Sequence, residues 1–330
     1  MSSDQFSRRG ILGIGLGLGA WIGTSIFTAG RAAAAAPLIG ISAPKFWRYK
    51  VGAFEITTIA DSEAFIDGPY PIIGKNASED EVRALMRANL VPETRYQPGF
   101  SPTLVNTGKE LVLFDTGNGA TGFVARPNGG WLKDQLGPAG FKPEDVDVVV
   151  LSHGHPDHVA GIIEGGKPLF PNARYVIAST EYDYWAPEGK HTGELEKLAS
   201  VFRANTATLS GKFKMIAPGE DVVPGIRSLD AAGHTPGHLA FVIESEGQHT
   251  LYWGDCAHHH VASLARPEWH CVFDIDAEKA VQTRKRIYDM AATERWSVIG
   301  YHMPFPSVGY VERRDAGGYR WIAHSFQLYP

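Results

Sequence analysis

The stretch from Val146 to Gly161, VDVVVLSHGHPDHVAG, joins a run of β-branched residues to a dense group of metal-binding side chains. The apolar run Val146–Leu151 predicts a buried strand that ends at Ser152. The residues that follow it in the spacing H-x-H-x-D-H are His153, His155, Asp157 and His158. Imidazole and carboxylate groups are ligands of zinc and similar divalent ions. The stretch therefore predicts a metal site at the end of a buried strand.

The spacing within this motif divides the four side chains between two positions. Residues two apart in an extended chain point the same way, so His153 and His155 can hold one ion. Asp157 and His158 come after Pro156, where we expect a short helix, and they face a second position. A polar loop with incidental histidines is the alternative interpretation, and ligands elsewhere in the chain argue against it.

Three further candidate ligands each follow a predicted apolar strand. They are His234, Asp255 and His302. A single histidine after a strand is usually structural, but an α/β sheet brings its strand ends to one edge, so the set is expected to converge. Asp115, at the end of strand 111–114, is expected to accept a hydrogen bond from a metal-bound imidazole or from the neighbouring loop. A turn-initiating aspartate is the alternative for that residue.

The remaining pattern predicts an α/β layered sandwich in one domain. Residues 46–59 alternate around Gly52 as an antiparallel hairpin, and residues 239–253 form another around the turn 245–248. Ser78 to Glu81 is a capping box for a helix to about Asn89, and Asp276 caps a helix to about Thr293. No repeat or linker after Ala36 separates domains.

Composition limits the classes of partner. The chain has 330 residues, 44% hydrophobic and 20% charged, which is typical of a globular protein. Its formal net charge of −5, without a cluster of Lys and Arg, argues against nucleic acid as a partner. Cys256 and Cys271 are the only cysteines, and we expect them to be free thiols.

The N-terminus has the pattern of a twin-arginine export signal. Ser7-Arg8-Arg9-Gly10-Ile11-Leu12 precedes a moderately apolar stretch and then the alanine run 32–36, which offers A-x-A cleavage sites. A membrane anchor is the alternative, but six glycines between residues 13 and 30 weaken it. We therefore expect residues 1–36 to be cleaved, residues 37–330 to form the functional domain, no stable membrane anchor, and a periplasmic or secreted product.

Four segments together resemble the metallo-β-lactamase superfamily of binuclear hydrolases. They are SHGHPDH, GHTPGH, GDCAHH and GYHMPF, and the strand ending in Asp115-Thr116-Gly117 extends the likeness. Length, export signal and ligand spacing are most similar to the methyl parathion hydrolase group and related secreted lactonases. The resemblance implies a four-layer αβ/βα sandwich, a homodimer, and two divalent metal ions, most commonly zinc. It implies one ion on His153, His155 and His234, a second on Asp157, His158 and His302, and Asp255 bridging both.

The resemblance and the ligand chemistry predict an enzyme. Two ions about 3.5–4 Å apart can share a water and lower its pKa, so a metal-bridging hydroxide is expected to open a lactone or an aryl ester. The candidate catalytic residues are the carboxylates Asp157 and Asp255. Hydrolysis of an organophosphate triester is the alternative. A β-lactamase, which would lack the ligand at Asp255, and a non-catalytic metal-binding protein are less favoured.

The positions of aromatic residues relative to the ligands predict an apolar substrate pocket. The candidates are Phe65, Phe123, Trp185, His258 and Phe273. Tyr182 and Tyr184 are equal candidates for a proton or oxyanion contact. His238 is expected to hydrogen-bond nearby backbone, because the ligand set is complete without it.

Overall fold

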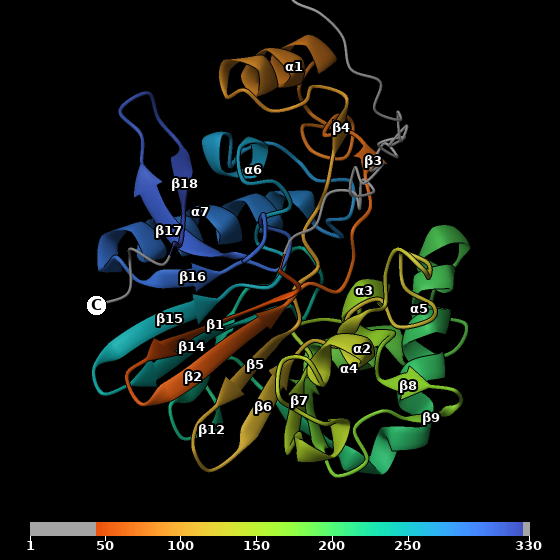
Figure 1. The fold of residues 1–330 in the computed structure, drawn as a ribbon. Helices are drawn as coiled ribbons and strands as arrows, with labels where there is room; N and C mark the ends of the chain where they lie inside the picture. The colour runs from red at the N-terminus through yellow and green to blue at the C-terminus, as the bar shows by residue number, and fades with distance from the viewer. Residues whose placement is uncertain (1–43, 326–330) are drawn as a thin grey trace, which may run out of the picture. The chain divides into compact units, whose positions relative to one another are not determined.

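The computed structural model describes residues 44–325. In this part of the chain, two seven-stranded sheets pack against each other and carry helices on their outer faces (Figure 1). The four-layer αβ/βα arrangement that the sequence predicted is confirmed. The predicted export signal, residues 1–36, lies outside the described residues.

The first sheet mixes antiparallel hairpins with parallel strands. In hydrogen-bonded order its strands are β1 (Phe46–Val51), β2 (Phe54–Ile59), β5 (Thr103–Asn106), β6 (Leu111–Phe114), β7 (Val148–Val150), β10 (Arg174–Ala178) and β11 (Phe213–Ile216). β6, β7, β10 and β11 run parallel, so β6, β7 and β10 finish at the same edge.

The second sheet is mainly antiparallel. Its order is β12 (Asp221–Val223), β13 (Ile226–Asp230), β14 (Leu239–Ser245), β15 (Gln248–Tyr252), β16 (Ser297–Ile299), β17 (Val308–Arg313) and β18 (Tyr319–Ala323). The parallel pair β15 and β16 brings Asp255 and His302, which follow them, to the same edge. Short pairs lie outside both sheets: β3 (Ile66–Asp67) with β4 (Arg95–Tyr96), and β8 (Ile163–Glu164) with β9 (Lys167–Pro168).

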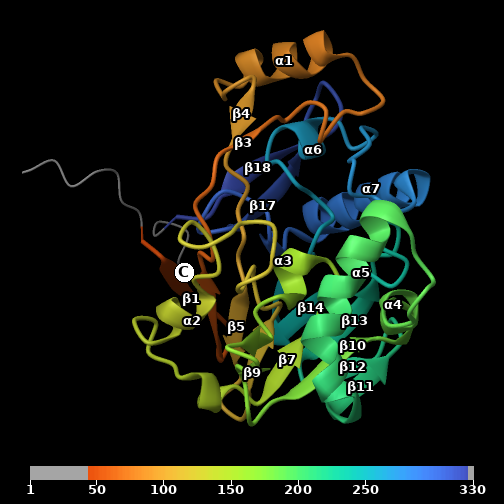
Figure 2. The same cartoon turned by 90° about the vertical axis from the view of Figure 1, so that its right-hand side faces the viewer.

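Helices cover the outer face of each sheet. The α-helices are α1 (Glu79–Ala88), α2 (Leu132–Leu136), α3 (Pro156–Val159), α4 (Ser179–Trp185), α5 (Gly193–Thr206), α6 (Ala262–Ala265) and α7 (Ala277–Glu294). Two 3₁₀ turns, η1 (Pro143–Asp145) and η2 (Ala207–Lys212), complete the set. α4 packs on β10 and β11 of the first sheet, and α7 lies along β17 of the second (Figure 2).

The alternation of side chains along each strand explains the layers. Val148 and Val150 of β7 join the core between the sheets, whereas Val149 faces the helices. In the second sheet, Tyr252 of β15 joins the core between the sheets, whereas Leu251 faces α7. A strand buried on both faces reads as a continuous apolar run, which is why the sequence around β7 predicted its position well.

Local sequence signals for the hairpins and helix ends are confirmed. β1 pairs with β2 and β14 with β15, each antiparallel as predicted. Ser78 caps α1 with the complete capping box, and the Asp276 side chain caps α7. Cys256 and Cys271 are free and buried.

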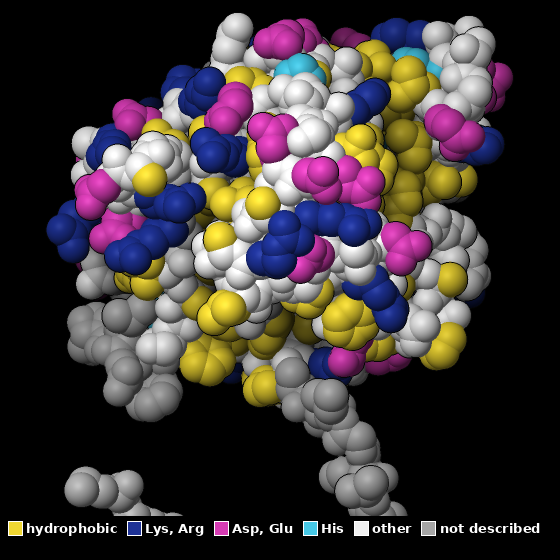
Figure 3. All heavy atoms as spheres, turned by 90° about the horizontal axis from the view of Figure 1, so that it is seen from above, with side chains coloured by type: hydrophobic (Ala, Val, Ile, Leu, Met, Phe, Trp, Pro, Cys, Tyr) yellow, Lys and Arg dark blue, Asp and Glu magenta, His cyan; other side chains and the backbone are white. Residues whose placement is uncertain are grey.

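The surface carries mixed charge on the face seen from above. Acidic and basic side chains lie next to one another there, with hydrophobic side chains between them (Figure 3). Within residues 44–325, no helix has the combination of length and apolar character needed to cross a membrane.

Candidate metal centre

All seven predicted ligands lie at one edge of the sandwich, on loops from both sheets. His153 and His155 follow β7, and Asp157 and His158 lie on the short helix α3. His234 lies between β13 and β14, Asp255 follows β15, and His302 follows β16. Because a strand ends shortly before each group, the ligands collect at this edge of the two sheets.

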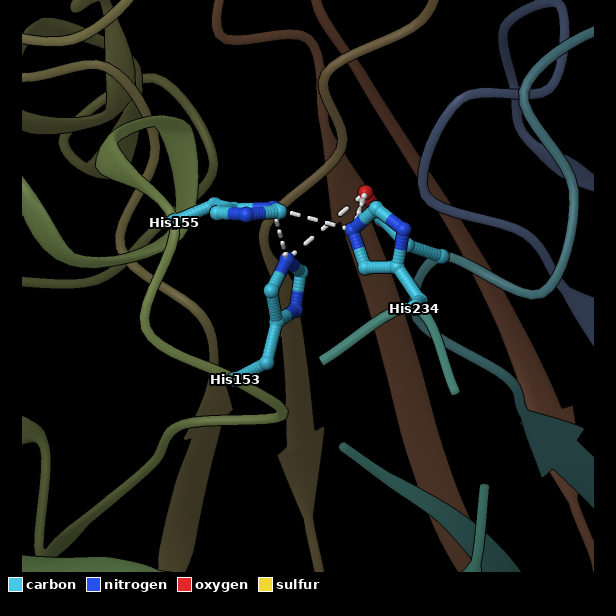
Figure 4. Close-up of side chains that lie close together, drawn as sticks. His153, His155 and His234 are labelled. Atoms are coloured by element: carbon cyan, nitrogen blue, oxygen red, sulfur yellow. Dashed lines mark hydrogen bonds and ion pairs between the residues drawn. The ribbon is translucent and has the colours of Figure 1, made fainter. Parts of the chain in front are cut away.

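His153, His155 and His234 form the first ion position (Figure 4). The Nδ1 atom of His155 lies 3.1 Å from Nε2 of His153 and 2.9 Å from Nε2 of His234. The Oδ2 atom of Asp255 lies 3.7 Å from Nε2 of His153 and 3.2 Å from Nε2 of His234. Three imidazole nitrogens and a carboxylate oxygen that point to one spot match the donor set of a zinc-type cation.

Asp157, His158 and His302 form the second ion position. The Oδ2 atom of Asp157 lies 3.3 Å from Nε2 of His158 and 3.5 Å from Nε2 of His302. Nε2 of His158 and Oδ1 of Asp255 are 3.2 Å apart, yet both are buried without a hydrogen-bond partner among the described residues. Such unpartnered buried polar atoms are costly unless an ion binds them, so the residues fit a divalent cation.

Asp255 lies between the two positions. Its Oδ2 atom is 3.1 Å from Nε2 of His302 as well as close to the first position, and its Oδ1 atom faces His158. A carboxylate in this place can bind two cations and reduce their mutual repulsion. The arrangement supports two divalent ions, with zinc favoured by the ligand types.

Buried acceptors orient the ligand imidazoles. The Nδ1–H of His158 faces Oδ2 of Asp115 at 2.8 Å, and that of His234 faces Oδ1 of Asp274 at 3.0 Å. His302 donates from Nδ1 to the backbone oxygen of Gly99 at 2.7 Å. These bonds fix which ring nitrogen is left for the metal. The predicted role of Asp115 as such an acceptor is confirmed, whereas the sequence did not single out Asp274.

The carboxylates set the protonation of the cluster. Burial lowers the pKa of His158, but Asp157, Asp255 and Asp115 outweigh it and hold that pKa well above its usual value. Burial acts the same way on His234, and Asp255 and Asp274 raise its pKa to about 9. Burial would raise the pKa of Asp255, yet His302, His158 and His153 hold it well below its usual range. Metal binding at these residues therefore displaces protons.

An apolar cavity of about 140 Å³ opens over the ion positions. Asp157, Asp255 and His302 line its floor, and its walls include Ile66, Tyr96, Phe100 and Val124. The predicted pocket residues Phe123, His258 and Phe273 line it as well. The rings of Phe123 and Phe273 stack 6.0 Å apart and remain partly exposed. Phe65 lines a neighbouring cavity of about 130 Å³, which shares Tyr96, His258 and His302 with the first.

The prediction that Trp185 lines the pocket is wrong. The residue is fully buried, its indole N–H donates to Oε1 of Glu181 at 2.6 Å, and its ring packs edge-on against His155. Trp185 therefore packs against the ligand His155 from the core and not from the cavity. Tyr182 and Tyr184 are also absent from the residues that line either cavity, and Tyr182 packs on Phe213 instead. His238 meets backbone as predicted, since it bonds Ala231 and the Asp255 N–H.

Asp61 was not predicted, and it holds the loop that contains Asp115. Its buried carboxylate accepts hydrogen bonds from the Asn118 N–H at 2.7 Å and the Leu132 N–H at 2.8 Å. The chain can approach this closely because residue 117 is glycine: a Cβ there would lie 2.4 Å from Cγ of Asp61. The partners are 57 and 71 residues away in the chain, so no local pattern points to them.

The stability contributed by Asp61 is expected to fall as pH rises. Burial raises the pKa of its carboxyl to about 6, against hydrogen bonds that lower it. An unfolded aspartate titrates near about 3.9, so the folded protein binds the proton more tightly between about pH 4 and pH 6. Urea denaturation should show the free energy of unfolding of wild type, relative to Asp61→Asn, decreasing by about 2–3 kcal/mol across this window.

Asp221→Asn is the matched control for this titration. Arg227 lowers the pKa of the exposed Asp221, so its small contribution should decrease only below about pH 4 and stay constant across the window in which Asp61 titrates. A wild-type to Asp61→Asn difference that is constant from pH 4 to pH 7 would contradict the assignment.

Comparison with known proteins agrees with this geometry. Residues 101–289 match the family model described as the metallo-beta-lactamase superfamily. An N-acyl homoserine lactonase of a Bacillus species is 29% identical over 159 residues, which is 43% of this chain and 57% of that protein. The chain thus aligns with little more than half the length of this relative.

Two solved structures superpose over most of the chain. "Hydrolase AbOPH in beta lactamase superfamily" has a TM-score of 0.80 and 28% identity, and covers 87% of this chain and 99% of that one. AidC, described as a dizinc quorum-quenching lactonase in complex with a product, has a TM-score of 0.77 and 26% identity, and covers 85% and 98%. With the family match across more than half of its residues, this chain belongs to the metallo-β-lactamase superfamily.

Proposed function

We propose that this protein is a metal-dependent hydrolase that opens a lactone or an aryl ester. The observation that carries the proposal is the position of Asp255 between two buried ligand groups at the floor of an apolar cavity. When bound, two divalent ions supply a water of lowered pKa and polarise the carbonyl oxygen of the substrate. The lactonase relatives and the dizinc lactonase structure support the same chemistry.

The residues of this chain contribute binding, orientation and exclusion of water. The walls formed by Phe100, Phe123 and Phe273 suit the hydrocarbon part of an ester. Their apolar surface leaves few competing hydrogen bonds, so the polar floor fixes where the scissile carbonyl lies. His258 lies on this floor with its Nε2 atom 3.4 Å from Oδ2 of Asp255, where it can contact the reacting group.

The protein is expected to hydrolyse lactones in a metal-dependent manner. Purified protein would be assayed on dihydrocoumarin, an acyl-homoserine lactone and methyl parathion, before and after treatment with a chelator. We expect turnover of at least one lactone, its loss on chelation and its recovery with Zn²⁺, because ions bound by this ligand set would supply the water of lowered pKa and polarise the carbonyl. Methyl parathion should be the poorest substrate, since a phosphotriester needs room around a tetrahedral centre.

Each alternative has its own result in this panel. Fast hydrolysis of methyl parathion with inert lactones would identify a phosphotriesterase. Absence of turnover on every substrate, with two ions bound, would favour a non-catalytic metal-binding protein.

A further inference from the structure

Glu181 is a fully buried carboxylate with four hydrogen-bond donors. Its Oε1 atom accepts from the Gly154 N–H at 2.8 Å and from Nε1 of Trp185 at 2.6 Å. Its Oε2 atom accepts from Oγ1 of Thr235 at 2.8 Å and from the Gly237 N–H at 2.8 Å. Burial raises the pKa of the Glu181 carboxyl, and the four bonds act in the opposite direction. All four donors point at the two oxygens, which leaves no place for a proton on either without displacing one of them.

Three of these four donors belong to the two loops that build the first ion position, and the fourth, Trp185, lies on α4 with Glu181 itself. Gly154 lies between the ligands His153 and His155, whereas Thr235 and Gly237 come one and three residues after the ligand His234. One loop follows β7 of the first sheet and the other joins β13 to β14 of the second. The carboxylate therefore joins the two halves of the sandwich next to the metal ligands.

Helix α4 lies close enough to both loops to leave no room for side chains at the two glycines. A Cβ at residue 237 would lie 2.3 Å from the Glu181 nitrogen, and one at residue 154 would lie 2.3 Å from Cδ1 of Trp185. Trp185, which Glu181 orients, packs against the imidazole of His155 at 5.6 Å between ring centroids. Glu181 thus fixes the two loops directly and one ligand ring through Trp185.

We propose that Glu181 is a positioning residue that sets the metal affinity of the first ion position. It touches no ligand imidazole and no substrate surface of the cavity, so it acts through the backbone of the ligand loops. The proposal rests on the two-ion site of the proposed function, but not on which ester that site opens.

The second ion position has different supports, which makes the proposal specific. His158 is held by Asp115, His302 by the Gly99 oxygen, and the backbone oxygen of Asp157 by the hydroxyl of Tyr301 at 2.6 Å. None of these bonds involves Glu181. Loss of Glu181 should therefore weaken one ion position and leave the other.

The experiment compares metal binding in wild type, Glu181→Gln and Glu181→Ala. Competition between the Zn²⁺-loaded protein and a chromophoric chelator gives the affinity of each ion, and anomalous diffraction from crystals shows which position keeps its ion. We expect the first position to weaken by about 10–100-fold and the second to keep its affinity. The glutamine side chain can keep three of the four bonds if Thr235 turns to act as acceptor, so Glu181→Gln should lose less affinity than Glu181→Ala.

Ile56→Ala is the control for a general loss of stability. Ile56 is buried in β2 within the core between the sheets, and its hydrocarbon side chain forms no hydrogen bond. This variant should unfold more easily and still bind both ions as wild type does. Wild-type affinity at the first position in both Glu181 variants, or equal weakening of both positions, would overturn the proposal. If Glu181→Ala does not fold, Glu181→Gln decides the question. Since binding is measured without substrate, failure of the lactone assay would not affect this result.

Discussion

Replacing Asp255 with alanine is expected to reduce the metal content to about one ion per chain and to lower kcat/KM for lactone hydrolysis by at least about 10³-fold. Oδ2 of Asp255 lies 3.1 Å from Nε2 of His302 and 3.2 Å from Nε2 of His234, so the carboxylate contacts both ion positions. Without its negative charge, the repulsion between two cations is offset less. Two-ion polarisation provides several kcal/mol, and about 4 kcal/mol corresponds to the stated loss in rate. Elemental analysis after desalting, together with steady-state kinetics, measures both quantities.

Asp276→Ala is a matched control for the loss of one aspartate. It removes the side chain that caps α7 through the Lys279 N–H, which should cost about 1 kcal/mol of stability and leave both ions bound. Retention of two ions with wild-type affinity in Asp255→Ala would show that Asp255 does not bridge. If Asp255→Ala keeps both ions and still loses activity, Asp255 contributes by orienting the substrate.

The parts of the site that could be predicted are those with short-range signals. Apart from Asp147, the run Val146–Leu151 is apolar and mostly β-branched, and the ligands follow it within seven residues, so strand, strand end and ligands appear in one window. His234, Asp255 and His302 could be added because each follows its own apolar strand. Sheet topology then brings these ends together, since β15 and β16 are parallel neighbours.

The supports behind the ligands could not be predicted, because their partners are distant in the chain. Glu181 bonds Gly154 and Gly237, which are 27 and 56 residues away. In the segment STEYDYW, a glutamate near the start of a short helix is most often exposed, and only the packing of α4 between two loops buries it. The available signal was Gly154, between His153 and His155, and Gly237, three residues after His234, because glycine allows close backbone approach.

Trp185 shows the same limit of the sequence, because this residue was predicted to line the pocket and lies in the core instead. An aromatic residue soon after the metal motif is compatible with a pocket wall and with the core. The direction of its side chain depends on where α4 begins after β10, and the helix turns Trp185 toward Phe202 and the other core residues of the helix layer. Proximity in sequence to the ligands did not determine the face.

Asp115→Asn is expected to weaken the second ion position by about 10–100-fold and to lower the free energy of unfolding by about 3 kcal/mol. Oδ2 of Asp115 accepts from Nδ1 of His158 at 2.8 Å and from the hydroxyl of Tyr252 at 2.6 Å, and Oδ1 accepts from the Ser152 N–H at 2.7 Å. An asparagine placed to keep the first two bonds turns its NH₂ group toward the Ser152 N–H, so a buried donor loses its acceptor. The substitution also removes the negative charge that holds the Nδ1–H of His158 and so leaves Nε2 free to bind the metal.

Asparagine is the informative substitution because Asp115 has a φ of 56°. Asn tolerates this left-handed conformation better than other residues with a Cβ, so Asp115→Asn isolates the carboxylate from the backbone. Asp115→Ala adds the backbone cost and should be less stable still. Chelator competition and anomalous diffraction should show the first position, held by Glu181 and Asp274, keeping its ion while the second loses affinity. Together with Glu181→Gln, which is expected to give the reverse pattern, this result would show that each ion position depends on its own buried carboxylate. Loss of the first ion instead of the second would mean that Ser152, whose Oγ lies 3.0 Å from Nδ1 of His153, transmits the change across the site.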